Sequence, residues 1–108
     1  MRKSYATFSP VGPTLVTADE IPDPYNLTLE AWVNGVLWCR AESGTMHWRL
    51  EDLIVHASRH ETVRAGEVWG IGTVGGGSMS EKGAELQPGD IVELTVTGLG
   101  RLRNVVKG

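Results

Sequence analysis

The sequence predicts a mainly β domain with one short helix, and three observations support this expectation. Residues 27–40 and 91–106 each alternate apolar and polar side chains on both sides of a tight turn. Only residues 49–60 repeat apolar side chains at helical spacing. Fourteen glycines and five prolines among 108 residues indicate many turns. A chain of this length forms one domain, which we place over residues 1–108.

The composition limits the class of partner. Hydrophobic residues make up 41% of the chain, which is typical of a folded protein rather than a disordered one. The formal net charge of −3 argues against a nucleic-acid partner, which would require a basic face. No apolar run is long enough to predict a membrane segment. Cys39 is the only cysteine, so no disulfide forms within the chain and a reduced, cytoplasmic location is expected.

The N-terminal segment is predicted to be extended and turning rather than helical, because Pro10 and Pro13 interrupt it. If its first residues are extended, Lys3 and Thr7 lie on the same edge, since even spacing returns a side chain to one face. Residues 14–17 have the composition of a β-strand. A loop rich in proline and acidic residues follows.

Residues 26–40 predict a β-hairpin with an Asn34-Gly35 turn, the favoured two-residue type. The turn sets three relations: Val33 opposite Val36, Ala31 on one face with Trp38, and Trp32 on the other face with Leu37. Both faces of the hairpin therefore carry large apolar groups. We expect a second sheet or a partner chain to cover them, because a lone hairpin would leave one face in water.

The one predicted helix spans residues 49–60. Its apolar stripe at positions i, i+3, i+4 and i+7 consists of Leu50, Leu53, Ile54 and Ala57. Acidic residues stand in its first turn and basic residues in its last, as the helix dipole favours.

Two groups of side chains are alternative metal sites on residue type alone. Asp19, Glu20 and Asp23 form an acidic cluster, although acidic residues beside proline are ordinary in turns. His56 and His60 are four residues apart, but they lie on the polar side of the helix and the sequence places no third ligand beside them. Ordinary turn chemistry and a solvated helix face are the plainer interpretations of the two groups.

Residues 65–78 predict a turn, a short apolar strand and then a glycine-rich loop. Backbone N–H groups and the Thr73 hydroxyl of such a loop can bind an oxyanion, although a mobile surface loop is the plainer interpretation. The loop lacks the spacing of a nucleotide-binding P-loop. The turn before it resembles residues 86–91, where glycine and an acid also precede an apolar strand. That second strand, residues 91–97, turns back at residues 98–100 into residues 101–106.

Taken together, a series of short motifs resembles the fumarylacetoacetate hydrolase family. The match runs nearly end to end, in the family's order and spacing. It consists of Lys3-Ser4-Tyr5-x-Thr7, Val11-Gly12-Pro13, Thr17-x-Asp19-Glu20-Ile21-Pro22-Asp23-Pro24, Val33-Asn34-Gly35, Leu53-Ile54-x-x-Ala57-Ser58-Arg59, Gly66-Glu67-Val68 leading to Gly72-Thr73, and Pro88-Gly89-Asp90 through Gly98-Leu99-Gly100-x-Leu102-x-Asn104.

The resemblance implies the family's β-roll, normally in a homodimer, and a chemistry. The family's enzymes use Mg²⁺ or a similar divalent ion to chelate a 2-oxo or β-diketo acid, with the metal as Lewis acid. They hydrolyse carbon–carbon bonds, decarboxylate, hydrate or isomerise on one scaffold, so the fold does not select the reaction.

The resemblance also implies roles for particular residues. Lys3 matches a catalytic lysine beside the metal carboxylates, and Thr7 matches the threonine of the same segment, both in the outer shell of the metal. Gly72 and Thr73 match the substrate-binding segment, in which the threonine hydrogen-bonds the substrate's acid group. Glu81 matches only loosely a glutamate that pairs with a catalytic histidine.

The metal-binding carboxylates of the family precede the segment that begins at Lys3, and the acidic residues of this chain do not stand at those places. Since Mg²⁺ requires oxygen ligands, three interpretations remain open. In the first, the chain is a subunit or fragment and another polypeptide supplies the missing half of a working site; the expected assembly is with a second polypeptide or as a homo-oligomer. Alternatively, the chain is a catalytically silent assembly domain. In the third interpretation it is a small β module that binds an anion at the glycine-rich loop.

Overall fold

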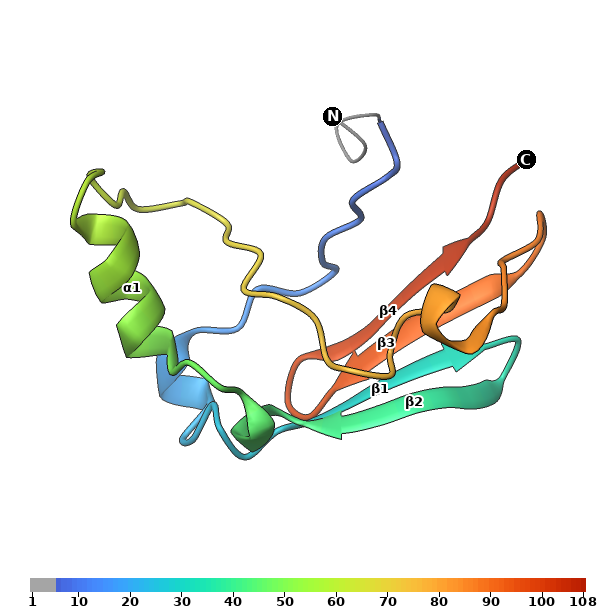
Figure 1. Cartoon of the computed structure of the whole chain (residues 1–108), viewed down its shortest axis with the longest axis horizontal. Coiled ribbons are helices and arrows are strands. Elements are labelled where there is room, and N and C mark those ends of the chain that lie inside the picture. Colours follow the sequence, from blue (N-terminus) through green and yellow to red (C-terminus); the bar gives the residue numbers. More distant parts are fainter. Residues whose placement is uncertain (1–5) are drawn as a thin grey trace.

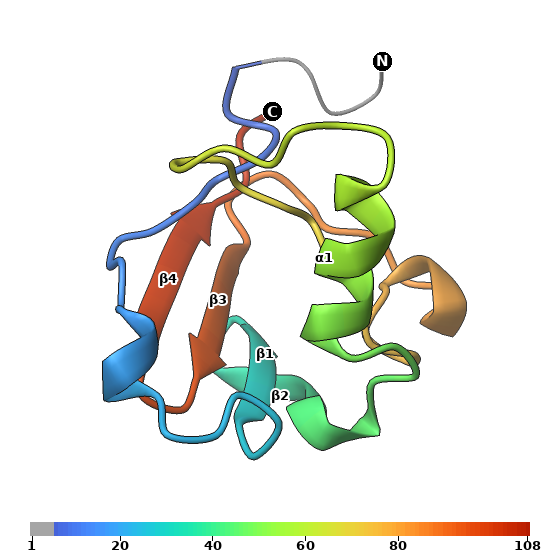
Figure 2. The ribbon, with the colours of Figure 1, turned by 90° about the vertical axis from the view of Figure 1, so that its left-hand side faces the viewer.

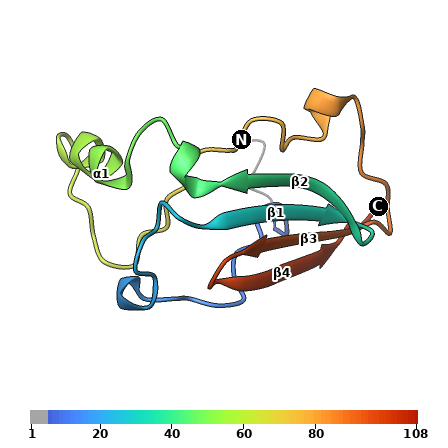
Figure 3. The same ribbon diagram turned by 90° about the horizontal axis from the view of Figure 1, so that it is seen from below.

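The computed structural model describes residues 6–108 and contains a four-stranded antiparallel sheet with the strand order β2-β1-β3-β4 (Figures 1 and 3). The strands are β1 (Thr28–Val33), β2 (Val36–Glu42), β3 (Ile91–Val96) and β4 (Gly100–Val105). The helices are α1 (Leu50–Ser58) and three 3-10 helices, η1 (Ala18–Glu20), η2 (Ser43–Thr45) and η3 (Ser80–Lys82). The expected mainly β fold with one short helix is confirmed.

The β1–β2 hairpin turns at Asn34 and Gly35, as predicted. Both residues have positive φ, 51° and 77°, as a type I′ turn requires. The Asn34 side chain also connects this turn to the neighbouring strand. Its Nδ2 donates to Asp90 Oδ1 at 2.8 Å, and its Oδ1 accepts the Ile91 N–H at 2.9 Å. One side chain therefore holds both the hairpin turn and the start of β3.

The register of the hairpin contains a β-bulge. Trp32 lies opposite Leu37 and therefore on the same face, as predicted, whereas Trp38, expected on the face of Ala31, has no partner in the register. Ala31 lies opposite Cys39 instead, because the register shifts between Ala31 and Trp32 and leaves Trp38 as the extra residue of β2. A bulge also increases the local twist, so β2 bends at this point.

The turn before β3 confirms the expected pattern of glycine followed by an acid. Gly89 has a φ of 95°, which a glycine adopts without strain. The Asp90 carboxylate accepts the N–H of Gln87 at 2.7 Å, and the Gln87 carbonyl accepts the N–H of Asp90 at 3.0 Å. This closed turn leads directly into β3, which forms the second predicted hairpin with β4.

The two faces of the sheet differ in chemistry. The pairing register places a set of mainly apolar side chains on one side, called here the apolar face: Leu29, Ala31, Cys39, Leu94, Val96 and Leu102. The other side, called the charged face, carries Glu30, Arg40, Glu93, Thr95, Arg101 and Arg103 together with the apolar side chains of Trp32 and Leu37. Arg101 donates to Glu93 at 3.1 Å, and the Arg40 and Glu30 side chains approach to 3.7 Å. Each glutamate of the charged face therefore has at least one arginine nearby.

Helix α1 lies within the predicted range and ends two residues earlier than expected. The Tyr25 hydroxyl accepts the N–H of Leu50, the first helical residue, at 2.9 Å and donates to the Glu51 carboxylate. The Asp52 carboxylate accepts the Arg49 N–H at 3.1 Å. These bonds satisfy backbone donors at the helix start, which otherwise have no partner within the helix. Figure 2 shows that α1 stands beside the sheet and does not lie across it.

Three local expectations are wrong. Residues 14–17 and the predicted strand within residues 65–74 are not strands, and residues 61–79 contain neither helix nor strand. Glycine explains the second case, since Gly66 and Gly72 have φ values of 87° and 113°, outside the β region. Thr7 lies in a turn with a φ of 73°, so the extended geometry assumed for it does not hold.

The described residues form no closed core. None of residues 6–108 is buried, and even the strand residues of the apolar face remain partly exposed. Over the same range, no helix combines the length and the apolar character that crossing a bilayer requires. Most of the regular backbone hydrogen bonding among these residues therefore comes from the two hairpins and from the pairing of β1 with β3 that joins them.

Candidate functional site

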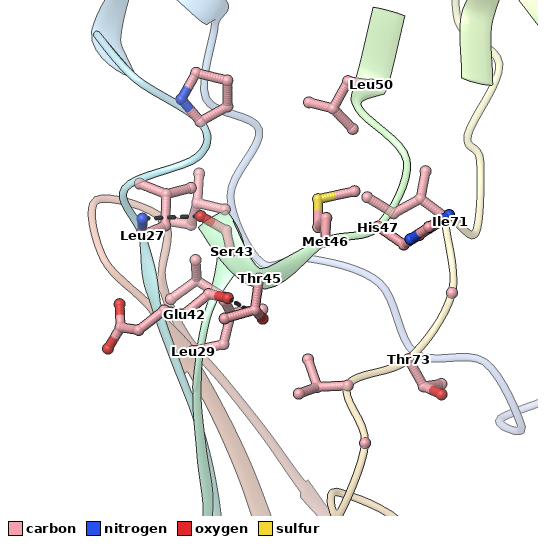
Figure 4. Close-up of a pocket in the computed structure, with 16 residues that line it drawn as sticks. Leu27, Leu29, Glu42, Ser43, Thr45, Met46, His47, Leu50, Ile71 and Thr73 are labelled. Carbon is pink, nitrogen blue, oxygen red and sulfur yellow. Dashed lines mark hydrogen bonds between the residues drawn. The ribbon is translucent and has the colours of Figure 1, made fainter. Parts of the chain in front are cut away.

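A cleft of about 420 Å³ opens where the sheet, the start of α1 and the glycine-rich loop meet (Figure 4). Its walls come from four separate parts of the chain, at residues 24–29, 42–50, 71–75 and 96–99. They are lined by Pro24, Leu27, Leu29, Glu42, Ser43, Thr45, Met46, His47, Leu50, Ile71, Gly72, Thr73, Val74, Gly75, Val96 and Leu99. Most of these side chains are apolar, so the cleft provides contact area more than charge.

The polar groups on the sheet side of the cleft hold the backbone in place. Ser43 Oγ accepts the Leu27 N–H at 2.9 Å, and the Thr45 hydroxyl donates to the Glu42 carbonyl at 2.8 Å (Figure 4). The Glu42 carboxylate accepts the Thr28 hydroxyl at 3.0 Å. These bonds connect η2 to the ends of β1 and β2. The polar groups on this side of the cleft therefore already have hydrogen-bond partners within the protein.

The opposite side of the cleft carries the residues that the sequence singled out. Gly72 and Thr73 both line it, and Figure 4 shows Thr73 on the loop, apart from Ser43 and Thr45. Gly72 has a φ of 113°, a conformation that L side chains rarely adopt. Within residues 6–108 the Thr73 hydroxyl has no hydrogen-bond partner and is exposed. It is therefore available to a bound group.

Thr73 also borders a second cavity of about 480 Å³, which lies against the apolar face of the sheet. Gly77 and Ser78 from the loop line it together with Leu94 and Val96 from β3. The loop thus passes over the apolar face without filling the space beneath it.

The far end of the loop is anchored to β2. The Lys82 ammonium group donates to the Trp38 carbonyl at 2.7 Å and lies 4.6 Å from the centre of the Trp38 ring. Glu81 accepts the Ser78 N–H at 3.4 Å, and the structure pairs it with no histidine among residues 6–108. Lys82 therefore fixes where the loop returns to the sheet.

The other expected site residues are not brought to the cleft. Lys3 lies outside the described residues, so its position relative to Thr73 stays a prediction. Thr7 is exposed and does not line the cleft. The sequence also gave no indication of the wall formed by Met46 and His47, because nothing in residues 41–47 marks them as more than a loop.

The donor set does not suit a divalent ion. Among residues 6–108, no three histidine, cysteine, aspartate or glutamate side chains are close enough to hold one. This includes the acidic cluster at residues 19–23 and the pair formed by His56 and His60. Mg²⁺ requires a nearly octahedral set of oxygen ligands, and among residues 6–108 Glu42 is the only carboxylate that lines the cleft. The described residues therefore do not by themselves form a metal site.

The carboxylates with perturbed titration lie elsewhere and serve the fold. The Tyr25 hydroxyl lowers the pKa of Glu51 at the start of α1. The Asn34 side chain, with help from the Gln87 N–H, lowers the pKa of Asp90. Neither carboxylate lines the cleft. Their perturbation reflects local hydrogen bonds that stabilise turns and a helix end, not a poised acid or base.

Several known proteins resemble this chain in sequence and in structure. The family model described as fumarylacetoacetate (FAA) hydrolase C-terminal matches residues 1–107. A mitochondrial oxaloacetate tautomerase of Xenopus laevis is 38% identical over 105 residues, which are 96% of this chain and 33% of the relative. The chain therefore spans about a third of the length of this curated relative.

Solved structures give the same result. Maleylpyruvate hydrolase from Sphingobium sp. SYK-6 superposes with a TM-score of 0.86 at 31% identity, over 99% of this chain and 38% of that one. The complex of the same enzyme with manganese(II) and pyruvate superposes with a TM-score of 0.82 at 29% identity, over 98% of this chain and 38% of that one. Fumarylacetoacetate hydrolase from Exiguobacterium antarcticum superposes with a TM-score of 0.82 at 35% identity, over 94% of this chain and 36% of that one. From its sequence match and its fold, the chain belongs to the fumarylacetoacetate hydrolase family.

Proposed function

We propose that this chain is part of a divalent-metal-dependent enzyme that acts on 2-oxo or β-diketo acids by carbon–carbon hydrolysis, decarboxylation, hydration or isomerisation. The observation that carries the proposal is the likeness, across nearly the whole chain, to a maleylpyruvate hydrolase whose structure holds manganese(II) and pyruvate. Metal-dependent chemistry on a 2-oxo acid is consistent with that likeness, because a divalent ion stabilises the enolate charge that such substrates develop.

We assign substrate binding to Gly72 and Thr73. The Thr73 hydroxyl has no hydrogen-bond partner among residues 6–108, so it can donate to a carboxylate oxygen of the substrate. The positive φ of Gly72 shapes the backbone just before it. Lys3 remains the proposed catalytic residue, and Lys3 and Thr7 remain proposed outer-shell groups of the metal, on the motif resemblance alone.

The ligands of the metal come from outside the described residues in this proposal. A second polypeptide supplies the carboxylates that hold Mg²⁺ or a similar ion, because another copy of this chain in a homo-oligomer would bring only the same residues. The assembled enzyme works inside the cell, which the lone cysteine of this sequence favours.

A second candidate function is a catalytically silent assembly domain. The absence of a metal-holding group within residues 6–108 favours it, since the family's chemistry depends on the ion. This candidate predicts no turnover in any assembly. An anion-binding β module is the third outcome, and it predicts anion binding at Thr73 without metal.

The deciding experiment is native mass spectrometry of the protein from its source with Mg²⁺ present, followed by turnover assays on oxaloacetate and a β-diketo acid. Thr73→Val removes one hydrogen bond to a charged substrate, worth about 1.5–3 kcal/mol, so kcat/KM falls roughly 10- to 150-fold. Thr62→Val is the matched control, because Thr62 is exposed and does not line the cleft. Metal-free protein without turnover would support the silent domain instead.

A further inference from the structure

The segment that follows Thr73, residues 74–84 and called here the loop unit, is held by its own hydrogen bonds. The Gly77 N–H donates to the Val74 carbonyl at 3.2 Å and closes a turn at one end. At the other end, backbone bonds of 3.1 and 3.2 Å close η3. Because these bonds are local, the place where the loop unit meets the sheet determines where Thr73 stands.

The loop unit meets the sheet at β2, and Lys82 makes the polar contact. Its ammonium group donates to the Trp38 carbonyl at 2.7 Å and lies 4.6 Å from the centre of the Trp38 ring. Figure 3 shows η3, drawn in orange, beside β2. Lys82 forms no ion pair among residues 6–108, so its charge is directed to β2 and not to an acidic side chain.

Gly77 makes a second, steric contact with the same strand. A Cβ at this position would lie 3.1 Å from the Val74 carbonyl oxygen and 3.7 Å from Cys39 Sγ. The missing side chain therefore lets the backbone turn back tightly and approach β2 closely. The two contacts of the loop unit fall on consecutive residues of β2, Trp38 and Cys39.

The β-bulge explains why the anchor lies at this point of β2. The register gives Trp38 no partner in β1, although both of its neighbours in β2 are paired. The extra residue of a bulge is left out of the ladder, so its carbonyl can accept a hydrogen bond from outside the sheet. The Trp38 indole N–H is buried without a hydrogen-bond partner among residues 6–108, so packing and Lys82 hold the ring.

We infer that Lys82 and Trp38 are positioning residues for substrate binding, because the anchor that they form on the bulge holds Thr73 at the cleft. The inference rests on the proposed function, in which Thr73 donates to the carboxylate of the substrate. Neither Lys82 nor Trp38 lines the cleft, so both act through the loop unit without touching the substrate. A hydrogen bond weakens steeply when its distance and angle change, so a loop unit released from β2 binds the carboxylate less well.

A double-mutant cycle on the assembled enzyme from its source, with oxaloacetate as substrate, tests this coupling. Lys82→Met should raise KM roughly fivefold at unchanged kcat, since the bond that it weakens exists before and during the reaction. In a Thr73→Val background the same substitution should change KM by less than about twofold, because the positioned bond is already absent. Lys82→Arg keeps a cationic donor and should restore KM, and the exposed Lys107 provides the control Lys107→Met.

An equal rise in KM with and without the Thr73 hydroxyl would overturn the inference, since Lys82 would then stabilise the fold and position nothing. An unchanged KM in Lys82→Met would overturn it as well.

Amide hydrogen exchange at Gly77 separates the anchor from the proposed function. Lys82→Met should accelerate this exchange about fivefold, and Lys107→Met should leave it unchanged. If the unsubstituted assembly turns over no 2-oxo acid, the proposed function fails, and faster exchange at Gly77 still supports the anchor. Unchanged exchange at Gly77 in Lys82→Met would remove the anchor whether or not the assembly is active.

Discussion

Asn34 holds two elements at once, so its replacement should loosen both. Its side chain accepts the Ile91 N–H at 2.9 Å, and its backbone has a φ of 51° in the left-handed region. Asn34→Ala removes two exposed side-chain hydrogen bonds, to Ile91 and Asp90, each worth about 0.5 kcal/mol, and places a residue with a Cβ but no local polar group at positive φ, for about 1 kcal/mol more. The sum of about 2 kcal/mol corresponds to a roughly 30-fold increase in local opening.

Amide hydrogen exchange of the assembled protein measures this opening directly. Asn34→Ala should accelerate exchange at the β1–β2 turn and at Ile91. Asn34→Gly is the matched comparison, because glycine accepts positive φ and loses only the hydrogen bonds, for a roughly fivefold change. Equal effects of the two variants would refute the contribution of φ. No acceleration at Ile91 in either variant would refute the hydrogen bond itself.

Three further outcomes are expected. Lys82→Met removes the hydrogen bond from the Lys82 ammonium group to the Trp38 carbonyl, which at this exposed position is worth about 1 kcal/mol. The rate of proteolysis within residues 72–79 should therefore rise about fivefold, and Lys107→Met is the control. An unchanged rate would show that Lys82 does not anchor the loop. The lowered pKa of Glu51 makes its contribution to the start of α1 complete above the ordinary value of 4.5 and lost as the pH falls through the lowered pKa. Titration by NMR should therefore show Glu51 returning toward its ordinary pKa in Tyr25→Phe, and an unchanged titration would exclude the Tyr25 hydroxyl as the cause. Removing divalent ions from the assembled protein should abolish turnover of a 2-oxo acid and Mg²⁺ should restore it, whereas turnover that survives chelation would contradict the proposed metal dependence.

Local chemistry explains why both hairpins could be predicted. Asn34-Gly35 specifies a type I′ turn through the conformations of two adjacent residues, and the Gly89-Asp90 turn closes on itself through Gln87. The stripe of α1 likewise follows from residues within three turns of helix. Such features depend on neighbours in the sequence, so they can be recognised without the rest of the fold.

The wrong expectations concern features that depend on distant partners. The bulge at Trp38 is a property of the β1–β2 ladder, and no residue type marks it in the sequence. The strand expected within residues 65–74 had suitable side chains, yet a strand also requires a neighbour to receive its backbone hydrogen bonds. Among residues 6–108 that neighbour is missing, and two glycines take the backbone out of the β region.

The candidate site also combines features that the sequence predicted with features that only the structure revealed. Motif resemblance identified the family and singled out Gly72 and Thr73, since both belong to one short segment whose order survives in the sequence. Only the tertiary structure revealed the cleft that joins them to Leu29 and Leu50, because those walls meet through chain folding and not through proximity in sequence. It alone also showed that the apolar face is uncovered, since burial is a property of everything packed around a side chain. The turns, the two hairpins and the family could thus be predicted from the sequence alone. The cleft and the exposure of the apolar face depend on the three-dimensional arrangement of the chain.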